Sequence, residues 1–476
     1  MKRKSQAVFV SPEEWEPQKR LLQDINKGWA TDFKQRKGRM PQYHITTFGC
    51  QMNEHDSEHL QGLLREAGFS ASEQADAELL LFNTCCIREH AEARVFGNVG
   101  ALQKRKEANP GLVIGVCGCM MQQPETAEAL FKRYPFVDMV FGTHALTCFP
   151  EILHRTLEGE RVIDVHDSDG RITEGLPTLR KQSASAFVTV MFGCNNYCTY
   201  CIVPYVRGRE RSRRMEDILT DLRELVADGV REITLLGQNV NSYGLDLEGD
   251  VDFPALLRRA NEVEGLERIR FMTSHPKDLS AGLIDAMADC DKVCNHIHLP
   301  VQSGSSTVLR AMNRCYSREE YLSLISRLRE RVPEIDLTTD IIVGFPGETE
   351  EDFEQTLSLV ESVGYASAFT FMYSPRRGTP AESMLDQVPQ EVKKDRLQRL
   401  NDLQAEMTRR NNEKYIGRRV KVFVEGIDER TQSMAFGKTA SFKMVYFPSE
   451  VDLTGQFIDV DVIEGRRASL VGKRIG

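Results

Sequence analysis

Six short apolar segments, each separated from the next by a helix-length stretch, constrain the fold of the central part of this 476-residue chain. Such alternation predicts parallel βα units, and six of them joined by right-handed crossovers form most of a barrel. Ligands of such a barrel bind at the carboxyl ends of its strands, so residues that follow the first strand are candidates for a site. The predicted strands are Phe187–Met191, Glu232–Leu236, Ile269–Met272, His296–Leu299, Leu337–Val343 and Ala368–Met372.

Three cysteines follow the first of these strands within eight residues. Cys194, Cys198 and Cys201 form a CxxxCxxC set, with Tyr200 directly before the last cysteine. Three thiolates can hold three irons of a cubane iron–sulfur cluster and leave the fourth iron without a protein ligand. That open iron could bind S-adenosylmethionine and pass an electron to its sulfonium, which releases a 5′-deoxyadenosyl radical. The spacing therefore indicates radical chemistry.

A structural zinc site is the alternative interpretation of these cysteines. Tetrahedral zinc requires a fourth Cys or His, usually from a second pair at its own spacing. The next histidine along the chain is His275 and the next cysteine is Cys290, so no such pair lies nearby. The sequence therefore favours the iron–sulfur cluster.

A second alternation of strands and helices runs from Tyr43 to about Leu157. It predicts a doubly wound parallel sheet with helices on both faces. Cys50, Cys85 and Cys119 each follow a predicted strand of this sheet. Because the carboxyl ends of the strands share one edge, we expect the three thiols to converge there and to hold a second cluster. The alternative is that they are merely buried, since cysteine is among the most buried residue types.

Other cysteines and a histidine pair have less support as metal ligands. Cys86 could replace its neighbour Cys85, and Cys117 would share a face with Cys119 on an extended strand. His296 and His298 share one face of a strand, and without a third ligand they are expected to line the barrel as polar residues. The cysteines predicted to be plain core or surface thiols are Cys148, Cys290, Cys294 and Cys315.

Composition and charge limit the class of protein. Hydrophobic residues make up 41% and charged residues 28%, which is ordinary for a globular chain. The net charge of −9 gives no global signature for nucleic acid, so any RNA contact must rely on local basic patches. No run approaches the ~20 apolar residues of a membrane span, and the start does not resemble an export signal. Twelve cysteines without such a signal predict a reducing compartment, the cytoplasm.

The last segment, from Arg418 to Arg474, alternates Val, Phe and Ile with polar residues and glycine turns, which predicts a small antiparallel barrel. Helical sequence from Gln390 to about Tyr415 precedes it. Its cations and aromatic side chains could contact phosphates and stack on bases, although the aromatic residues could instead be core. These residues are Arg418, Arg419, Lys421, Lys438, Lys443, Phe436, Phe442 and Tyr446.

A run of arginines follows the CxxxCxxC set. These guanidinium groups could bind the cofactor carboxylate or RNA phosphates, because the arginine fork suits both. A solvated charge run is the alternative, and Glu210 within the run fits that interpretation. The arginines are Arg207, Arg209, Arg211, Arg213 and Arg214.

Four motifs resemble those of the radical-SAM methylthiotransferases, and most closely the bacterial tRNA adenosine type, the MiaB type. They are Thr47–Glu54, Asn83–Glu89, Gly115–Cys119 and Gly193–Cys201. Further segments agree with the family: Leu236–Asn241, Thr273–Pro276, Leu299–Ser305 and Val343–Thr349. The resemblance extends from about Tyr43 to the C-terminus.

This resemblance implies two [4Fe-4S] clusters, of which the auxiliary cluster belongs to Cys50, Cys85 and Cys119. It implies S-adenosylmethionine both as methyl donor and as radical source, and a terminal TRAM domain that binds RNA. Tyr200, Gly237, Gln238 and Asn239 match family positions that contact S-adenosylmethionine, although strand-end packing would also explain them. No side chain is assigned a catalytic role.

The implied reaction installs a methylthio group at C2 of N6-isopentenyladenosine beside the anticodon of tRNA. We expect an electron donor such as flavodoxin or ferredoxin, a monomeric chain and no membrane association. A ribosomal-protein aspartate methylthiotransferase of the RimO type shares both cluster motifs, but Gln51, Met52 and Asn53 after Cys50 resemble the tRNA branch. A non-catalytic iron–sulfur RNA-binding protein is a third possibility, against which the motif around Cys194 argues.

Five divisions of the chain are expected. They are an N-terminal extension (1–40), a methylthiotransferase N-terminal domain with the auxiliary cluster (41–160), a linker (161–185), a radical-SAM domain (186–410) and a TRAM domain (411–476). The extension departs from typical bacterial members of the family. It contains Trp15, Trp29 and a helix-like stretch from Pro12 to Lys27, so we expect it to pack on the fold as a surface clasp. Arg36, Lys37 and Arg39 leave a tRNA contact open.

Overall fold

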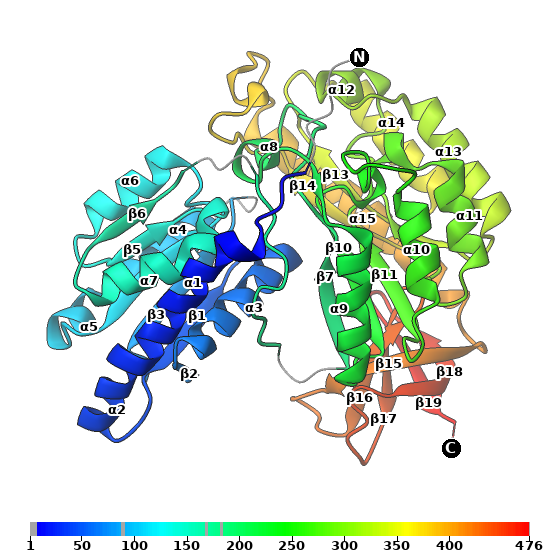
Figure 1. Ribbon diagram of the computed structural model, residues 1–476. Coiled ribbons are helices and arrows are strands. Elements are labelled where there is room, and N and C mark those ends of the chain that lie inside the picture. The colour runs from blue at the N-terminus through cyan, green and yellow to red at the C-terminus, as the bar shows by residue number, and fades with distance from the viewer. Residues whose placement is uncertain (1–6, 87–90, 167–169, 181–183, 476) are drawn as a thin grey trace. The chain divides into compact units, whose positions relative to one another are not determined.

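The computed structural model describes residues 7–86, 91–166, 170–180 and 184–475 (Figure 1). The chain forms two compact units, which are described separately. Unit 1 comprises Met1–Lys181, Phe192–Asn195 and Ile202–Arg213. Unit 2 comprises Gln182–Met191, Asn196–Cys201 and Arg214–Gly476. The five sequence divisions remain a prediction.

Unit 1 is built on a six-stranded parallel sheet with the order β2-β1-β3-β4-β5-β6. The chain runs from β1 outward to β2 and then crosses to β3 on the other side, so the winding reverses between β1 and β3. In such open sheets, ligands bind outside the carboxyl ends of the strands at this switch point. The strands are β1 (Gln42–Thr47), β2 (Ser70–Ala71), β3 (Leu79–Thr84), β4 (Val113–Gly118), β5 (Met139–Phe141) and β6 (Val162–Asp164).

Helices cover both faces of this sheet, which confirms the doubly wound fold. Leu79 and Leu81 of β3 pack in a core with α1, α3 and α7, whereas Leu80 and Phe82 pack in a second core with α4 and α6. This alternation explains why β3 is apolar throughout, since a strand that is buried on both faces has no polar side. The helices are α1 (Pro12–Ile25), α2 (Thr31–Lys37), α3 (Gln51–Glu66), α4 (Ala91–Gly100), α5 (Gln103–Ala108), α6 (Pro124–Arg133) and α7 (Phe149–Leu157).

The N-terminal extension is part of unit 1, as expected of a clasp. Helix α1 begins with a capping box, in which Ser11 and Glu14 bond to each other's backbone N–H groups. Its Trp15 is 4% exposed and joins the core formed with α3 and α7. Beyond it, Trp29 stacks on Phe33 and Phe69, with ring centroids 5.6 and 5.4 Å apart.

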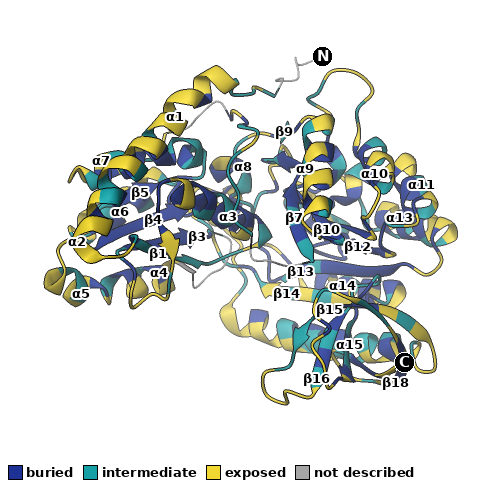
Figure 2. Cartoon of the chain, turned by 60° about the horizontal axis from the view of Figure 1, so that its bottom comes forward, coloured by how far each residue is buried: buried dark blue, intermediate teal, exposed yellow. Residues whose placement is uncertain are grey.

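Unit 2 contains the six predicted βα strands, arranged as two three-stranded parallel sheets. Their orders are β11-β10-β7 and β12-β13-β14. Figure 2 shows the strands as mostly buried except for β14, which is exposed to intermediate, and the outward faces of the helices as exposed. The strands are β7 (Ser185–Thr189), β10 (Glu232–Leu236), β11 (Arg268–Met272), β12 (His296–His298), β13 (Asp336–Val343) and β14 (Ser367–Met372).

Helices follow these strands and pack against them in one large core. Two of them begin at capping boxes, Ser317 with Glu320 on α13 and Thr349 with Asp352 on α14. The helices are α9 (Met215–Ala227), α10 (Phe253–Asn261), α11 (Ala281–Asp289), α12 (Ser306–Ala311), α13 (Arg318–Arg331), α14 (Glu350–Val363) and α15 (Gln390–Glu413). A short β8 (Met191–Phe192), α8 (Val203–Val206) and β9 (Arg211–Ser212) surround the CxxxCxxC motif in the sequence.

The C-terminal segment forms the expected small barrel, which is closed in the order β15-β16-β17-β19-β18. Its strand pairs are antiparallel as predicted, except that β17 and β19 pair in parallel. Val422, Val445 and Val460 are among its fully buried core residues. The strands are β15 (Arg419–Ile427), β16 (Met434–Thr439), β17 (Met444–Pro448), β18 (Phe457–Gly465) and β19 (Leu470–Arg474), drawn in orange to red in Figure 1.

Two arginines of β11 join this barrel to the remainder of unit 2. Glu232 of β10 accepts from Arg268 at 3.0 Å and from Arg270 at 3.1 Å, and all three side chains are buried. The same guanidinium groups donate to barrel carbonyl groups, Arg268 to Lys438 O at 3.0 Å and Arg270 to Thr439 O at 2.7 Å. The barrel is therefore a fixed part of unit 2.

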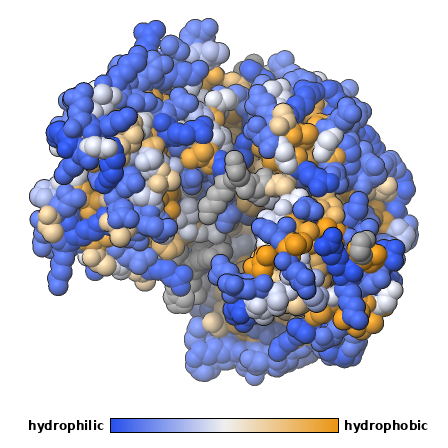
Figure 3. Space-filling model, turned by 90° about the horizontal axis from the view of Figure 1, so that it is seen from below, coloured by the Kyte–Doolittle hydropathy of each residue, from blue (hydrophilic) through white to orange (hydrophobic). Residues whose placement is uncertain are grey.

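Among the described residues on the face drawn in Figure 3, hydrophilic side chains predominate and apolar ones lie in several groups between them. Within the ranges that the structure describes, no helix combines the length and the apolar character that a bilayer crossing requires.

Candidate metal centres

Cys50, Cys85 and Cys119 lie at the carboxyl edge of the unit 1 sheet, as the sequence predicted. Cys50 caps the start of α3 after β1, Cys85 directly follows β3 and Cys119 directly follows β4. Thr84 and Gly118 are in register at the ends of β3 and β4, so the two cysteines that follow them leave neighbouring strands at the same level. The reversal between β1 and β3 thus brings cysteines to the switch point of the sheet.

Gly118 allows Cys119 to turn away from the path of β4. Its φ of +96° is a left-handed conformation, and a Cβ atom there would lie 2.5 Å from Thr84 O. Only glycine fits this position. Cys117 precedes the turn and packs with the aliphatic core of unit 1, whereas Cys119 packs with Ile202 and Val206. The expectation that Cys117 would share a face with Cys119 is therefore wrong.

Asn53 ties the first turn of α3 to the end of β3. Its fully buried amide donates to Asn83 Oδ1 at 3.1 Å and to Thr84 O at 3.0 Å. Asn83 Nδ2 donates back to Asn53 O at 2.8 Å, and the Cys50 thiol donates to Asn53 Oδ1 at 3.3 Å. One amide therefore places the segment of Cys50 against the segment of Cys85.

Cys119 has the electrostatic environment of a metal-binding thiolate. Its pKa is lowered to about 7, first by a hydrogen bond with Cys86 and further by the positive charge of Arg207, against the effect of burial. The thiolate is the form that binds iron. Cys85, which we assigned as the ligand, is buried, while Cys86 contacts Cys119 in this structure.

Arg207 makes the contact that sequence reasoning missed. Its Nε donates to Cys119 Sγ at 3.1 Å and its Nη2 donates to Asp56 Oδ2 at 2.7 Å. Both Arg207 and Asp56 are buried. Arg207 stood in a run of five arginines without any sign of a partner, and the carboxylate that holds it lies 151 residues earlier.

The rest of the arginine run is not a uniform solvated surface. Arg213 is buried and donates to Glu174 Oε2 at 2.9 Å, and Arg211 lies over the Phe192 ring at 5.8 Å. Arg209 is exposed. The interpretation of this run as a solvated charge run is therefore wrong for Arg207 and Arg213.

The thiols fit an iron–sulfur cluster by their chemistry. In the described residues, no three His, Cys, Asp or Glu side chains are placed to hold a single metal ion. A cubane cluster does not need that arrangement, because each thiolate binds a different iron. Cys50 interacts electrostatically with both Cys119 and Arg207, so soft sulfur donors and a balancing cation are present together.

The CxxxCxxC motif is divided between the two units, and its parts are described within each. In unit 1, Cys194 N donates to Gly208 O at 3.1 Å, and Asn195 N donates to Glu210 Oε1 at 3.1 Å. The loop that contains Arg207 therefore also holds the backbone of the first cysteine of the motif.

In unit 2, Cys198 is 6% exposed and accepts from Arg314 Nη1 at 3.6 Å. Arg314 also donates to Pro300 O at 2.6 Å and to Tyr316 Oη at 2.9 Å. Cys201 N donates to Cys198 O at 2.9 Å, so the last two cysteines share one tight turn. A buried guanidinium group thus accompanies a cysteine of each motif.

The four residues predicted to contact S-adenosylmethionine lie in unit 2. Tyr200 packs on a cluster that contains Phe345 and Tyr373. Gly237, Gln238 and Asn239 follow β10, and the Asn239 amide donates to Asp278 at 2.7 Å and accepts from His275 N at 3.2 Å. Asn239 therefore joins two strand-end loops, and contact of any of the four with the cofactor stays a prediction.

His296 and His298 line the interior, as expected. His296 Nε2 and His298 Nδ1 lie 2.9 and 3.0 Å from Thr338 Oγ1. The His296 ring also stacks on Phe442 of the terminal barrel, with centroids 4.9 Å apart.

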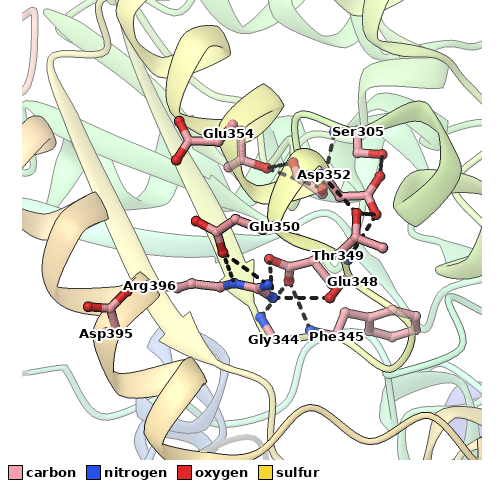
Figure 4. A network of polar contacts seen from close by, with 12 residues as sticks. Ser305, Gly344, Phe345, Glu348, Thr349, Glu350, Asp352, Glu354, Asp395 and Arg396 are labelled. Atoms are coloured by element: carbon pink, nitrogen blue, oxygen red, sulfur yellow. Dashed lines mark hydrogen bonds and ion pairs between the residues drawn. The ribbon is translucent and has the colours of Figure 1, made fainter.

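A buried network holds the loop that follows β13 (Figure 4). Glu348 accepts from the backbone N–H groups of Gly344 and of Phe345, the latter at 3.1 Å, and pairs with Arg396 at 3.3 Å. Asp352 accepts from Ser305 Oγ at 2.5 Å, which links the loop that follows the neighbouring strand β12. The motif Val343–Thr349 therefore serves to order the carboxyl ends of the unit 2 strands, where barrel ligands bind.

The basic surface of the terminal barrel is partly neutralised. Arg418 pairs with Glu334 at 2.8 Å, Arg419 with Asp461 at 3.2 Å and Lys438 with Glu425 at 2.8 Å. Lys443 is buried beside Asp336, and this burial lowers its pKa. Of the five cations, Lys443 is therefore withdrawn from the surface, and contact of the other four with RNA stays a prediction.

Comparisons with known families divide the chain into three matches. Residues 188–360 match the Radical SAM superfamily, and residues 413–475 match the TRAM domain. Residues 42–142 match the family described as Uncharacterized protein family UPF0004. The fold and the cysteine motifs thus define a radical SAM protein with a terminal TRAM domain.

Curated relatives match almost the whole chain under one name, tRNA-2-methylthio-N(6)-dimethylallyladenosine synthase. The protein of Clostridium tetani is 54% identical over 93% of this chain and 97% of its own length. The protein of Alkaliphilus oremlandii is 50% identical over 98% of both chains. The chain therefore belongs to the family of MiaB-type radical SAM methylthiotransferases. Because the second alignment covers 98% of this chain, the N-terminal extension has a counterpart in that relative.

A solved structure shares the fold at low sequence identity. The radical S-adenosylmethionine methyltransferase TsrM from Kitasatospora setae, described with cobalamin and a [4Fe-4S] cluster bound, has a TM-score of 0.53 and 13% identity. The match covers 81% of this chain and 80% of that one. At this identity the likeness concerns the fold alone.

Proposed function

We propose that this chain is a tRNA-2-methylthio-N6-dimethylallyladenosine synthase, which adds a methylthio group to C2 of N6-isopentenyladenosine beside the anticodon. The observation that carries the proposal is the coexistence, in one chain, of the CxxxCxxC motif and a second cysteine set at the switch point of the unit 1 sheet. Relatives that are 50 to 54% identical over almost the whole chain carry this activity in their name.

The cofactors follow from the family, and we assign their ligands on the chain. We infer that Cys194, Cys198 and Cys201 hold the radical-generating [4Fe-4S] cluster and that Cys50, Cys85 and Cys119 hold the auxiliary one. Of these residues, Cys119 is supported by its lowered pKa and by the contact with Arg207. Tyr200, Gly237, Gln238 and Asn239 are assigned to S-adenosylmethionine.

The chemistry of the substrate explains why cofactors are needed. The C2–H bond of adenine is neither acidic nor electrophilic enough for polar substitution by a side chain. When bound, the two clusters and two molecules of S-adenosylmethionine supply the radical, the methyl group and the site for sulfur. The side chains described here bind, orient and shield these groups. We assign no proton transfer to a side chain.

The remaining partners are also proposals. We infer that flavodoxin or ferredoxin supplies the electron, that the enzyme acts as a monomer, and that it works in the cytoplasm, where thiols stay reduced. The TRAM barrel supports the binding of tRNA, because five-stranded barrels of this kind commonly bind nucleic acids.

The test is the nucleoside composition of tRNA from a strain that lacks this protein. Mass spectrometry should show N6-isopentenyladenosine without its 2-methylthio form, and the intact gene should restore the product. The Cys194→Ala variant and the Cys119→Ala variant should both fail to restore it. Cys315→Ala, an exposed thiol outside both motifs, should restore it fully.

Unchanged methylthio nucleoside in the deletion strain would overturn the proposal. If methylthiolation of a ribosomal-protein aspartate were lost instead, the RimO-type alternative would take its place.

A further inference from the structure

We propose that Arg207 is a positioning residue that sets the reduction potential of the metal group bound by Cys119, with Asp56 as its counter-charge. The inference rests on the proposed auxiliary cluster and concerns a residue outside the cysteine motifs. It starts from a contact in unit 1, in which Arg207 Nε lies 3.1 Å from Cys119 Sγ.

The geometry of Arg207 is fixed from three sides. Its Nη2 donates to Asp56 Oδ2 at 2.7 Å, while its backbone N donates to Val203 O at 2.8 Å at the end of α8. The carbonyl group of the preceding residue, Val206, accepts from Thr143 Oγ1 at 2.8 Å. The guanidinium group is therefore preorganised to point one N–H bond at the sulfur.

The surroundings make this contact strong. Arg207 is 6% exposed, Asp56 is 8% exposed and Cys119 is 4% exposed. With little water to screen them, the charges of Arg207 and Asp56 both act on the sulfur.

Hydrogen bonds to ligand sulfurs and nearby charge are established determinants of cluster potentials. Reduction adds one electron to a [4Fe-4S]²⁺ cluster to give [4Fe-4S]⁺, so negative charge on the sulfurs increases. An N–H donor stabilises that charge and raises the potential, whereas the carboxylate of Asp56 opposes it. The two residues must therefore act on the potential in opposite directions.

The other cysteine motif offers a contrast within unit 2. Arg314 Nη1 lies 3.6 Å from Cys198 Sγ, and its other hydrogen bonds go to a carbonyl and a phenol, with no carboxylate among the described residues. The positive charge of Arg207 beside Cys119 is balanced by the Asp56 carboxylate, whereas no carboxylate balances the charge of Arg314 beside Cys198 in the described structure. This difference favours placing the electron on the cluster that generates the radical.

The test uses full-length protein in which Cys194, Cys198 and Cys201 are changed to Ala, so that only the auxiliary cluster remains. Midpoint potentials are measured by titration with dithionite in the presence of mediators, with the reduced cluster followed by electron paramagnetic resonance. Arg207→Gln should make reduction of the cluster roughly tenfold less favourable, which lowers the midpoint potential by ~59 mV for one electron. Asp56→Asn should raise it. Arg209→Gln, an exposed arginine of the same loop, is the matched control and should not shift it.

The outcomes separate this inference from the proposed function. Equal potentials in all variants at full iron content overturn the inference alone, whereas a parent protein without iron overturns the auxiliary site itself. If only Arg207→Gln loses iron, the Asp56→Asn variant decides the inference: a raised potential supports it, and an unchanged or lowered potential overturns it. Loss of iron in both variants but not in Arg209→Gln also overturns the inference, because the contact would then merely hold the fold.

Discussion

Single buried side chains place the candidate ligands of this protein. Asn53 joins the segment of Cys50 to the end of β3, and Arg207 joins Cys119 to Asp56. The polar groups in both contacts are buried away from water, so a group that lost its hydrogen-bond partner would find no water to replace it, at a cost in folding free energy. Residue-scale predictions therefore concern the thiols and the buried charges.

The choice between Cys85 and Cys86 can be tested by iron content. We expect Cys85→Ala to lose about four iron atoms per chain after anaerobic reconstitution, because it removes one thiolate of the auxiliary cluster. Cys86→Ala should retain both clusters, although it removes the hydrogen bond with Cys119. The reverse pattern would show that the second of the adjacent cysteines is the ligand.

Buried His55 and partly buried His59 should make unit 1 sensitive to acid. His55 and His59 lie 4.5 Å apart, and burial lowers the pKa of His55 well below 6.5 and that of His59 to about 4. Between about pH 4 and pH 6.5, the histidine of the unfolded chain binds a proton that the histidine of the folded chain does not. The stability is therefore present above pH 6.5 and is lost as the pH falls toward 4.

Urea unfolding of the apo protein measures this effect. The contribution of His59 corresponds to roughly 2 kcal/mol between about pH 7.5 and about pH 5. His59→Gln should flatten the pH dependence in that window. An identical pH dependence in the two proteins would contradict the assignment.

At the scale of elements, buried side chains attach helix α1 to unit 1 and the terminal barrel to the remainder of unit 2. Helix α1 packs in one core with α3 and α7, and the terminal barrel is attached through the arginines of β11. Both depend on a few deeply buried side chains. Substitution of those side chains should therefore have large effects.

Trp15 tests the attachment of α1. Its removal leaves a cavity among the leucines of the unit 1 core, so Trp15→Ala should lower the free energy of unfolding by roughly 3–5 kcal/mol. Lys19→Ala, on the exposed side of the same helix, should change it by less than ~0.5 kcal/mol. Denaturant unfolding of the apo protein gives both values, and equal stability of the two variants would show that α1 does not contribute to the core.

Glu232 tests the attachment of the barrel. Glu232→Ala leaves Arg268 and Arg270 buried without their carboxylate, which should destabilise unit 2 by roughly 3–5 kcal/mol. Calorimetry of the apo protein should show the loss as a lower melting temperature. Exposed Glu264→Ala is the control, and the prediction fails if the two variants melt together.

For the whole molecule, the question is how a chain with a net charge of −9 binds tRNA. Since Arg418, Arg419, Lys438 and Lys443 each have an acidic partner, we expect the contact to use other cations of the barrel. Lys421, Lys473 and Arg474 are exposed, and no salt bridge involves them in the described structure. They lie on β15 and β19, the two strands that flank β18 in the barrel.

Changing these three residues to Ala should weaken tRNA binding and reduce the slope of log affinity against log salt by up to ~2–3 units, through lost counterion release. Filter binding at several salt concentrations measures this slope. Substitution of Lys19, Arg20 and Lys132 in unit 1 is the charge-matched control. Equal effects of the two sets would mean that the barrel contributes only general charge.

The sequence by itself determined the order of the elements, the closed terminal barrel and the position of Cys50, Cys85 and Cys119 at one sheet edge. These features depend on local periodicity and on the rule that parallel strands end together, so short windows suffice. The motifs also sufficed for the family, to which relatives of 50 to 54% identity assign the chain.

Only the tertiary structure decided which charges are available. Arg207 and Arg419 look alike in the sequence, yet the first is buried against a thiol and a carboxylate and the second forms an exposed ion pair. Along the sequence, Cys119 and Asp56 lie 88 and 151 residues from Arg207, and Asp461 lies 42 residues from Arg419. The energy of a charge depends on its burial and on its neighbours in space, and the fold sets both.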